Sequence, residues 1–229
     1  MIDRPSVQTV QAEWDRYWSG KAKNTFRLYD VIAEIYRKFI IMPTLNYFIN
    51  KYFPEGAKLL HAGCGSGQVD TGLAKRFKIS ALDLSLPALD IYKSIHGDSC
   101  EIIQGNIFDI PVQGASFDGV YNLGVMEHFS ESEIQKILKE FERVLKPNGK
   151  LVIFWPPEFG MSVWFLKNVH YVLNHLLKRN VKLHPAEITR LCSRQHAERI
   201  FQRAGFKTVD YYFGVRDLFT HAVIVAVKK

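Results

Sequence analysis

From Ala57 onward, the sequence alternates short apolar runs with amphipathic stretches. The runs cover residues 58–62, 78–82, 100–104, 119–123, 150–155, 208–213 and 221–227. Between the first five of them lie helical candidates near 69–77, 86–96 and 131–145. Strands that alternate with helices form βαβ units, whose crossover helices cover both faces of a mainly parallel sheet. The pattern therefore predicts an α/β fold of the doubly wound type.

The last two runs break this alternation. They are joined by residues 214–220, which leave no room for a helical crossover, so these strands should pair antiparallel. The preceding connection, 156–207, is much longer than a simple crossover requires. We expect its first part to be an insertion and 193–204 to be the crossover helix, which Gly205 ends.

Before the first strand, residues 12–52 are rich in aromatic side chains and predict helices, with a break or kink at Pro43. No internal repeat, low-complexity tract or linker divides the chain, so we expect a single domain over 1–229. Its predicted parts are a helical cap over 1–56, a core over 57–155, a helical insertion over 156–192, and a final helix and hairpin over 193–229.

Composition narrows the class of protein. Of the 229 residues, 47% are hydrophobic and 23% are charged, which is typical of a globular protein and excludes disordered, collagen-like and coiled-coil chains. The net charge of +7 favours an anionic partner. Three scattered cysteines predict neither a disulfide framework nor a zinc site. With no signal peptide and no apolar run of membrane-spanning length, these features lead us to expect a cytoplasmic protein.

A glycine-rich loop follows the first strand, in the stretch LLHAGCGSGQ of residues 59–68. It is not the dinucleotide fingerprint, because Gln68 stands where the third glycine belongs, and it lacks the GK[ST] of a P-loop. Asp83 ends the second strand, where a carboxylate is placed to accept ribose hydroxyls. Asn106 and Ile107 follow the third strand and suit the edge and face of an adenine.

Five stretches in this order, LLHAGCGSG, ALDLS, GNIFDIP, FDGVYNLGVMEHF and RVLKPNGKLVI, span residues 59–154. In them the chain resembles the class I S-adenosylmethionine-dependent methyltransferases, and most of all the branch with quinone-biosynthesis and small-molecule enzymes, the type 11 kind. The resemblance implies S-adenosyl-L-methionine as cofactor. It also implies a Rossmann-like, seven-stranded mixed sheet with an antiparallel final strand, N-terminal helices and a helical lid inserted after the fifth strand.

The resemblance also implies which residues bind the cofactor. The loop glycines would cradle its methionine portion, Asp83 its ribose, and the residues after the second and third strands its adenine. Residues at the end of the fourth strand would lie beside the sulfonium, and Tyr29 and Tyr36 would close over the cofactor or belong to the core. The cofactor-binding set is His61, Gly63, Cys64, Gly65, Gly67, Asp83, Leu84, Asn106, Ile107, Asn122, Leu123 and Tyr29.

Two of these positions depart from the family pattern. His61 stands where the family usually has an acidic residue, and Asn106 stands where aspartate is common. A neutral imidazole still accepts a hydrogen bond, whereas a protonated one opposes the cofactor's amino group. His61 is thus either a cofactor contact or a packing residue, while Asn106 keeps an acceptor for adenine.

Glu127 and His128 follow the fourth strand, at the edge where open α/β sheets bind ligands. We consider both as catalytic candidates, with His128 as a general base. The alternative is that the pair orients the loop over the cofactor. Related quinone-type enzymes form a metal site with a further acidic residue where this chain has Gly124, so no metal is predicted.

The stretch 156–207 carries most of the positive charge, with nine Lys and Arg against three Glu. Within it, residues 161–179 predict an amphipathic helix. Three roles remain open for this helix: a solvated cover of the site, a contact for an acidic or amphiphilic substrate, or peripheral membrane contact.

The leading hypothesis is methyl transfer to a small or amphiphilic metabolite by in-line displacement. The alternatives are an RNA-modifying methyltransferase and a non-catalytic, cofactor-binding scaffold or regulatory protein. No recognisable RNA-binding module supports nucleic acid as the partner. The acceptor atom and the oligomeric state are left open by the sequence.

Overall fold

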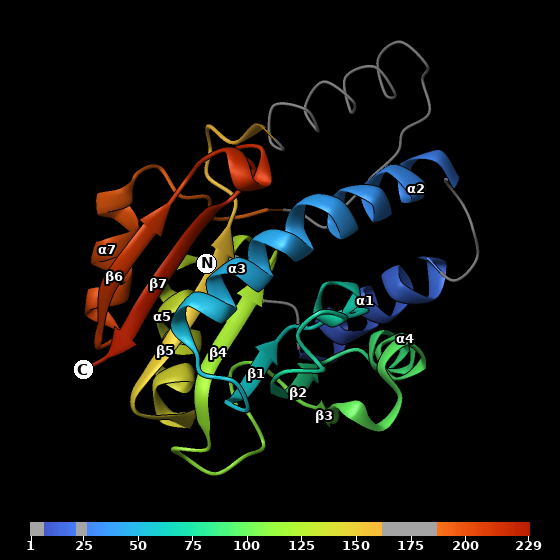
Figure 1. Cartoon of the computed structure of the whole chain (residues 1–229), viewed down its shortest axis with the longest axis horizontal. Coiled ribbons are helices and arrows are strands. Elements are labelled where there is room, and N and C mark those ends of the chain that lie inside the picture. Colours follow the sequence, from blue (N-terminus) through green and yellow to red (C-terminus); the bar gives the residue numbers. More distant parts are fainter. Residues whose placement is uncertain (1–6, 22–26, 162–186) are drawn as a thin grey trace.

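The computed structural model describes residues 7–21, 27–161 and 187–229, without the side chains of 7–9, 21 and 27–30. Its centre is a seven-stranded sheet with the order β3-β2-β1-β4-β5-β7-β6 (Figure 1). The strands are β1 Lys58–Ala62, β2 Lys78–Asp83, β3 Glu101–Gln104, β4 Phe117–Leu123, β5 Leu145–Trp155, β6 Phe206–Tyr212 and β7 Ala222–Lys228. The predicted doubly wound α/β fold is confirmed.

The sheet is mixed, as the short connection before the last strand predicted. Strands β1 to β5 pair in parallel, whereas β7 pairs antiparallel with both β5 and β6. The register places Trp155, the last residue of β5, opposite Ala222, the first residue of β7. The start of β7 therefore lies at the edge where the parallel strands end.

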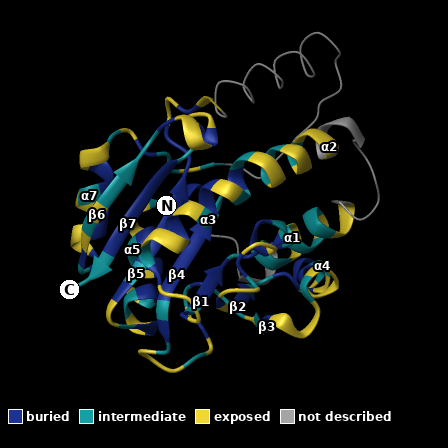
Figure 2. Ribbon diagram, viewed as in Figure 1, coloured by how far each residue is buried: buried dark blue, intermediate teal, exposed yellow. Residues whose placement is uncertain are grey.

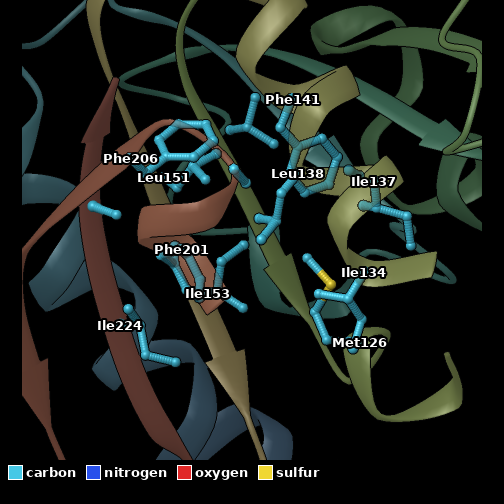
Figure 3. Close-up of a cluster of buried hydrophobic side chains, with 14 of the residues drawn as sticks. Met126, Ile134, Ile137, Leu138, Phe141, Leu151, Ile153, Phe201, Phe206 and Ile224 are labelled. Carbon is cyan, nitrogen blue, oxygen red and sulfur yellow. The ribbon is translucent and has the colours of Figure 1, made fainter. Parts of the chain in front are cut away.

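One face of the sheet is covered by α5, Glu131–Val144, and α7, Arg194–Arg203. Figure 3 shows their apolar side chains meeting those of the strands, among them Leu138 and Phe201. Serine residues start both helices. Ser130 forms a capping box with Glu133, and the side chain of Ser193 accepts a hydrogen bond from the backbone of His196 at 3.1 Å.

The opposite face is covered by α3, Met42–Tyr52, and α4, Leu86–His96. Phe48 of α3 is buried, with its ring centroid 6.2 Å from that of Phe154 in β5 and 5.5 Å from that of Tyr212 in β6. Figure 2 shows this helix buried on its inner side. Helix α3 thus belongs to one helical layer of the α/β sandwich, although the sequence analysis assigned it to an N-terminal cap.

The N-terminal helices are α1, Val7–Lys21, and α2, Arg27–Tyr36, which continues through a π-helical turn, Arg37–Ile41, into α3. The prediction at Pro43 is a break or a kink, and the break is wrong, because Ile41 and Met42 keep helical backbone angles. A proline clashes with the carbonyl four residues earlier, and the wider π turn directly before Pro43 gives its ring room. Of the helices in the described ranges, none is long and apolar enough to cross a membrane.

The helix predicted over 69–77 is also wrong. The chain forms a 3₁₀ turn, Gln68–Asp70, followed by further turns. Leu73 and Ala74 both donate to the carbonyl of Asp70, so the bonding alternates between three- and four-residue spacing. Gly72 interrupts the stretch, because the backbone there runs so close to α3 that an added Cβ would lie 2.6 Å from the Asn46 side chain.

If α3 is a structural layer, Phe48→Ala lowers the free energy of unfolding by about 3–5 kcal/mol, because it leaves a cavity beneath two rings. Phe39→Ala is the matched control, since Phe39 is 63% exposed, and it should change stability by about 0.5 kcal/mol or less. Urea denaturation of both variants measures the difference. Equal, small losses would show that α3 is a detachable cap.

Candidate functional site: a cavity at the carboxyl ends of the strands

A cavity of about 860 Å³ lies where β1, β2, β3 and β4 end. Open α/β sheets bind ligands at this edge, and the volume is in the upper part of the range of small-molecule sites. Of the predicted residues, the cavity is lined by His61, Gly63, Cys64, Gly65, Gly67, Asp83, Leu84, Asn106, Ile107, Leu123 and His128. The structure therefore brings most of the predicted site together.

The glycine loop is anchored to the second strand. The backbone N–H of Gly63 donates to the Leu82 carbonyl at 2.8 Å, and that of Gly65 donates to Asp83 Oδ2 at 2.8 Å. The other carboxylate oxygen of Asp83 accepts from Ser85 N at 2.9 Å. Each carboxylate oxygen has a second lone pair, so Asp83 keeps acceptors for ribose hydroxyls.

Gly67 shows why the loop needs glycine. Its φ of +63° lies in the left-handed region, and an added Cβ would lie 2.1 Å from the Tyr92 ring of α4. The loop therefore fits tightly between the sheet and α4, with its backbone facing the cavity.

A buried carboxylate, Asp70, lies beneath this loop and is the main feature that sequence reasoning missed. It is fully buried and contacts His61 Nδ1 at 2.7 Å, Tyr92 Oη at 2.8 Å and Tyr121 Oη at 2.8 Å. The His61 ring also stacks on Tyr121, with centroids 4.4 Å apart. Burial raises the pKa of both tyrosines, so both phenols stay protonated and donate to Asp70. No motif marked Asp70 in the sequence.

Asn106 lines the cavity, but part of its amide is already engaged. Its Oδ1 accepts from the backbone N–H of Phe108 at 3.0 Å, which shapes the turn after β3. The second lone pair of Oδ1 and the amide hydrogens are left for an adenine edge.

Asn122 is not in the cavity wall. It is fully buried and donates from Nδ2 to the Ala62 carbonyl at 2.6 Å, so it holds the end of β1 against β4.

Tyr29 belongs to α2, but its side chain is outside the described part. Most of the predicted insertion, including nearly all of 161–179, is outside it too.

Glu127 and His128 lie in different surroundings. Glu127 is buried behind the cavity, and its backbone carbonyl accepts from Ile188 N at 2.6 Å and Thr189 N at 3.0 Å. Burial raises the pKa of its carboxyl to about 7. His128 lines the cavity and packs edge to face on Trp14 of α1, with ring centroids 5.4 Å apart.

The cavity has further walls that sequence reasoning did not assign. Trp14 and Trp18 of α1 line it, and Ser85 Oγ donates to Asp15 Oδ1 of that helix at 2.6 Å. Arg37 lines it beside the loop, with Nε donating to Gln68 Oε1 at 2.9 Å, and His221 lines it at the start of β7. In the described ranges, no three His, Cys, Asp or Glu side chains are grouped to hold a metal.

Comparison with known proteins identifies the family of this chain. A family model described as a methyltransferase domain matches residues 60–153. An uncharacterized methyltransferase from Synechocystis sp. is 31% identical over 157 residues, which are 62% of this chain and 72% of that protein. A tRNA (carboxymethyluridine(34)-5-O)-methyltransferase from Arabidopsis thaliana is 29% identical over 140 residues, 59% of this chain and 33% of that protein.

The chain spans only part of several relatives. It covers 64% of an uncharacterized Haemophilus influenzae protein and 26% of a probable tRNA methyltransferase 9B from Bos taurus.

Solved structures share the fold. The magnesium protoporphyrin IX methyltransferase from Synechocystis, with bound S-adenosylhomocysteine, has a TM-score of 0.69 at 14% identity and covers 97% of this chain and 99% of its own. A methyltransferase from Methanosarcina mazei has a TM-score of 0.62 at 19% identity and covers 79% of this chain and 96% of its own. The chain belongs to the class I S-adenosylmethionine-dependent methyltransferases of the type 11 kind. The cofactor of this family is S-adenosylmethionine.

The residues present fit this cofactor. The glycine loop lines the cavity, and an added Cβ at Gly63 or Gly65 would lie 2.6 Å from Val125 or Trp18, which line it too. The terminal N–H groups of the Arg37 guanidinium suit a carboxylate, Asp83 suits ribose hydroxyls, and Ile107 offers an apolar face for a base. When bound, the cofactor supplies an electrophilic methyl group and its leaving group.

The contact between His61 and Asp70 predicts the effect of restoring an acid at position 61. His61→Asp would place two carboxylates in one buried site, where both cannot ionise. We expect it to weaken S-adenosylhomocysteine binding about tenfold or more, measured by calorimetry, because the glycine loop begins two residues later. The double variant His61→Asp/Asp70→Asn should recover much of the affinity. Unchanged affinity in the single variant would make His61 a packing residue only.

The raised pKa of Glu127 predicts a pH-dependent stability. Its ordinary pKa of 4.5 rises to about 7 on folding, so stability falls as pH increases from 4.5 through 7. Relative to the wild type, Glu127→Gln should therefore gain about 2–3 kcal/mol between pH 4.5 and pH 8. Urea denaturation at both pH values measures this gain. A difference that does not change with pH would contradict a buried, proton-retaining carboxyl.

Proposed function

We propose that this methyltransferase acts on a small or amphiphilic metabolite. The supporting observation is a group of aromatic side chains in the cavity wall, formed by Trp14 and Trp18 of α1 and Tyr36 of α2. Such a wall suits an apolar body of limited size, which the chain aligns with the methyl group while water is kept out. Arg37 and His221 add polar groups for an acidic or polar end of the acceptor.

We propose that His128 helps to close the site by orienting the loop after β4. Its packing on Trp14 joins the loop after β4 to α1, and the hydrogen bonds to the Glu127 carbonyl attach that loop to residues 188–189. This supports the orienting role of the pair over a role of His128 as base.

RNA modification is the second candidate, since curated relatives include tRNA methyltransferases and the chain has a net charge of +7. The comparisons do not favour it over a small acceptor. We also propose a cytoplasmic location, which suits three unpaired cysteines. Peripheral membrane contact through 161–179 stays a hypothesis about residues mostly outside the described part.

Methyl-labelled cofactor distinguishes the two acceptors. The purified chain is incubated with it and with total RNA, an aqueous metabolite fraction or an organic-soluble metabolite fraction. We expect label in a metabolite fraction, and none with Gly67→Val, which obstructs the loop. Label in RNA alone, or in no fraction, would contradict a metabolite acceptor.

For His128, the orienting role predicts that His128→Ala weakens S-adenosylhomocysteine binding about three- to tenfold and leaves kcat within about threefold. Calorimetry and saturating label-transfer assays measure the two effects. A general base contributes about 10²–10⁴-fold to the rate. A loss of that size with intact cofactor binding would instead make His128 the base.

A further inference from the structure

The cavity has an end that the cofactor residues do not use. Asp83 and Asn106 follow β2 and β3, on one side of the glycine loop. His221 directly precedes β7, three strand steps from β1 on the other side, or about 14 Å at the usual strand spacing. It lines the same cavity as the loop. A group at this end faces the side left for the acceptor.

Asp217 fixes the His221 ring. The carboxylate is fully buried, and its Oδ2 accepts from the His221 backbone N–H at 2.6 Å and lies 3.3 Å from His221 Nδ1. Thr220 Oγ1 lies 3.0 Å from both Asp217 Oδ2 and His221 Nδ1. We assign the ring proton to Nδ1, because a carboxylate partner selects that tautomer, and this leaves a lone pair on Nε2.

One oxygen of the Asp217 carboxylate is unpaired. Asp217 Oδ1 is buried and has no hydrogen-bond partner within the described ranges. An unpaired oxygen of a buried carboxylate is costly, and a positive charge that forms on the neighbouring ring during the reaction offsets part of that cost. In the described part of the chain, Nε2 of His221 has no hydrogen bond. The His221 side chain is 17% exposed.

Two more titratable groups, Tyr36 and Glu127, lie near His221. The Tyr36 hydroxyl bonds to Thr220, and burial raises the pKa of this phenol, so it stays neutral and holds Thr220 in place. Glu127 interacts electrostatically with His221, and with a pKa of about 7 it is partly neutral at physiological pH. Asp217 is therefore the carboxylate that directly orients the ring.

We propose that His221 is the general base of the methyl transfer and that Asp217 is its positioning residue; this builds on the proposed function. The acceptor X–H gives its proton to His221 Nε2 while its electron pair forms the X–CH₃ bond. The S–CH₃ bond breaks, and its electrons return to sulfur, giving S-adenosylhomocysteine. The imidazolium that forms is stabilised by Asp217 and later releases the proton to water.

The activity test compares His221→Gln with His196→Gln in the pool that accepts label from the wild type. His196 is the matched control, because it is also a histidine beside a carboxylate, Glu131 at 2.9 Å, and lies outside the cavity wall. We expect His221→Gln to lower kcat about 10²–10⁴-fold while S-adenosylhomocysteine binding changes less than threefold. His196→Gln should keep kcat. A kcat within threefold of wild type in His221→Gln would overturn the proposal.

A second measurement needs no acceptor, and its deciding readout is on the wild-type protein. Nitrogen-15 NMR of histidine-labelled wild-type protein, loaded with S-adenosylhomocysteine, reports the tautomer of His221. We expect the proton on Nδ1, and a move toward Nε2 in Asp217→Asn. A proton on Nε2 in the wild type would overturn the proposal, even if His221→Gln does not fold.

The outcomes for substrate and base are distinguishable. Label in RNA with a large loss in His221→Gln would contradict the metabolite acceptor and support the base. Label in a metabolite with no loss in His221→Gln would do the reverse.

Discussion

The buried carboxylate of Asp70 is the interaction on which the site depends. It joins β1, α4 and β4 through His61, Tyr92 and Tyr121, directly beneath the glycine loop. A charge that is fully buried is tolerated only when donors surround it, so these three side chains must keep their places together. The loop that faces the cofactor is held in position by this requirement.

The sheet places the residues of the site along one edge. Parallel strands end at the same side, so Gly63, Asp83 and Leu123 meet there although they come from β1, β2 and β4. The antiparallel β7 adds its beginning to that edge instead of its end. This reversal is why His221, from the last part of the chain, shares a cavity with the loop after the first strand.

Sequence patterns predicted the positions of the seven strands along the chain well, because apolar runs that alternate with amphipathic stretches reflect local burial. They failed over 69–77, where the backbone at Gly72 lies against α3. At Pro43 the helix does not break, because a π turn directly before it accommodates the proline ring. Within the site, motif spacing placed the loop glycines and Asp83 correctly in one cavity. It also placed Asn122 beside the sulfonium; the structure leaves Asn122 out of the cavity wall, with its amide donating to the Ala62 carbonyl.

By itself, the sequence determined the doubly wound fold, the glycine loop and the methyltransferase family, since all three follow from residue types at short, regular spacing. Only the tertiary structure decided which polar side chains face one another across long separations. Asp70 carries no motif, and Asp217 and His221 lie in a hairpin loop without a distinguishing pattern. Their significance comes from burial and from hydrogen-bond geometry, which exist only once the strands have assembled.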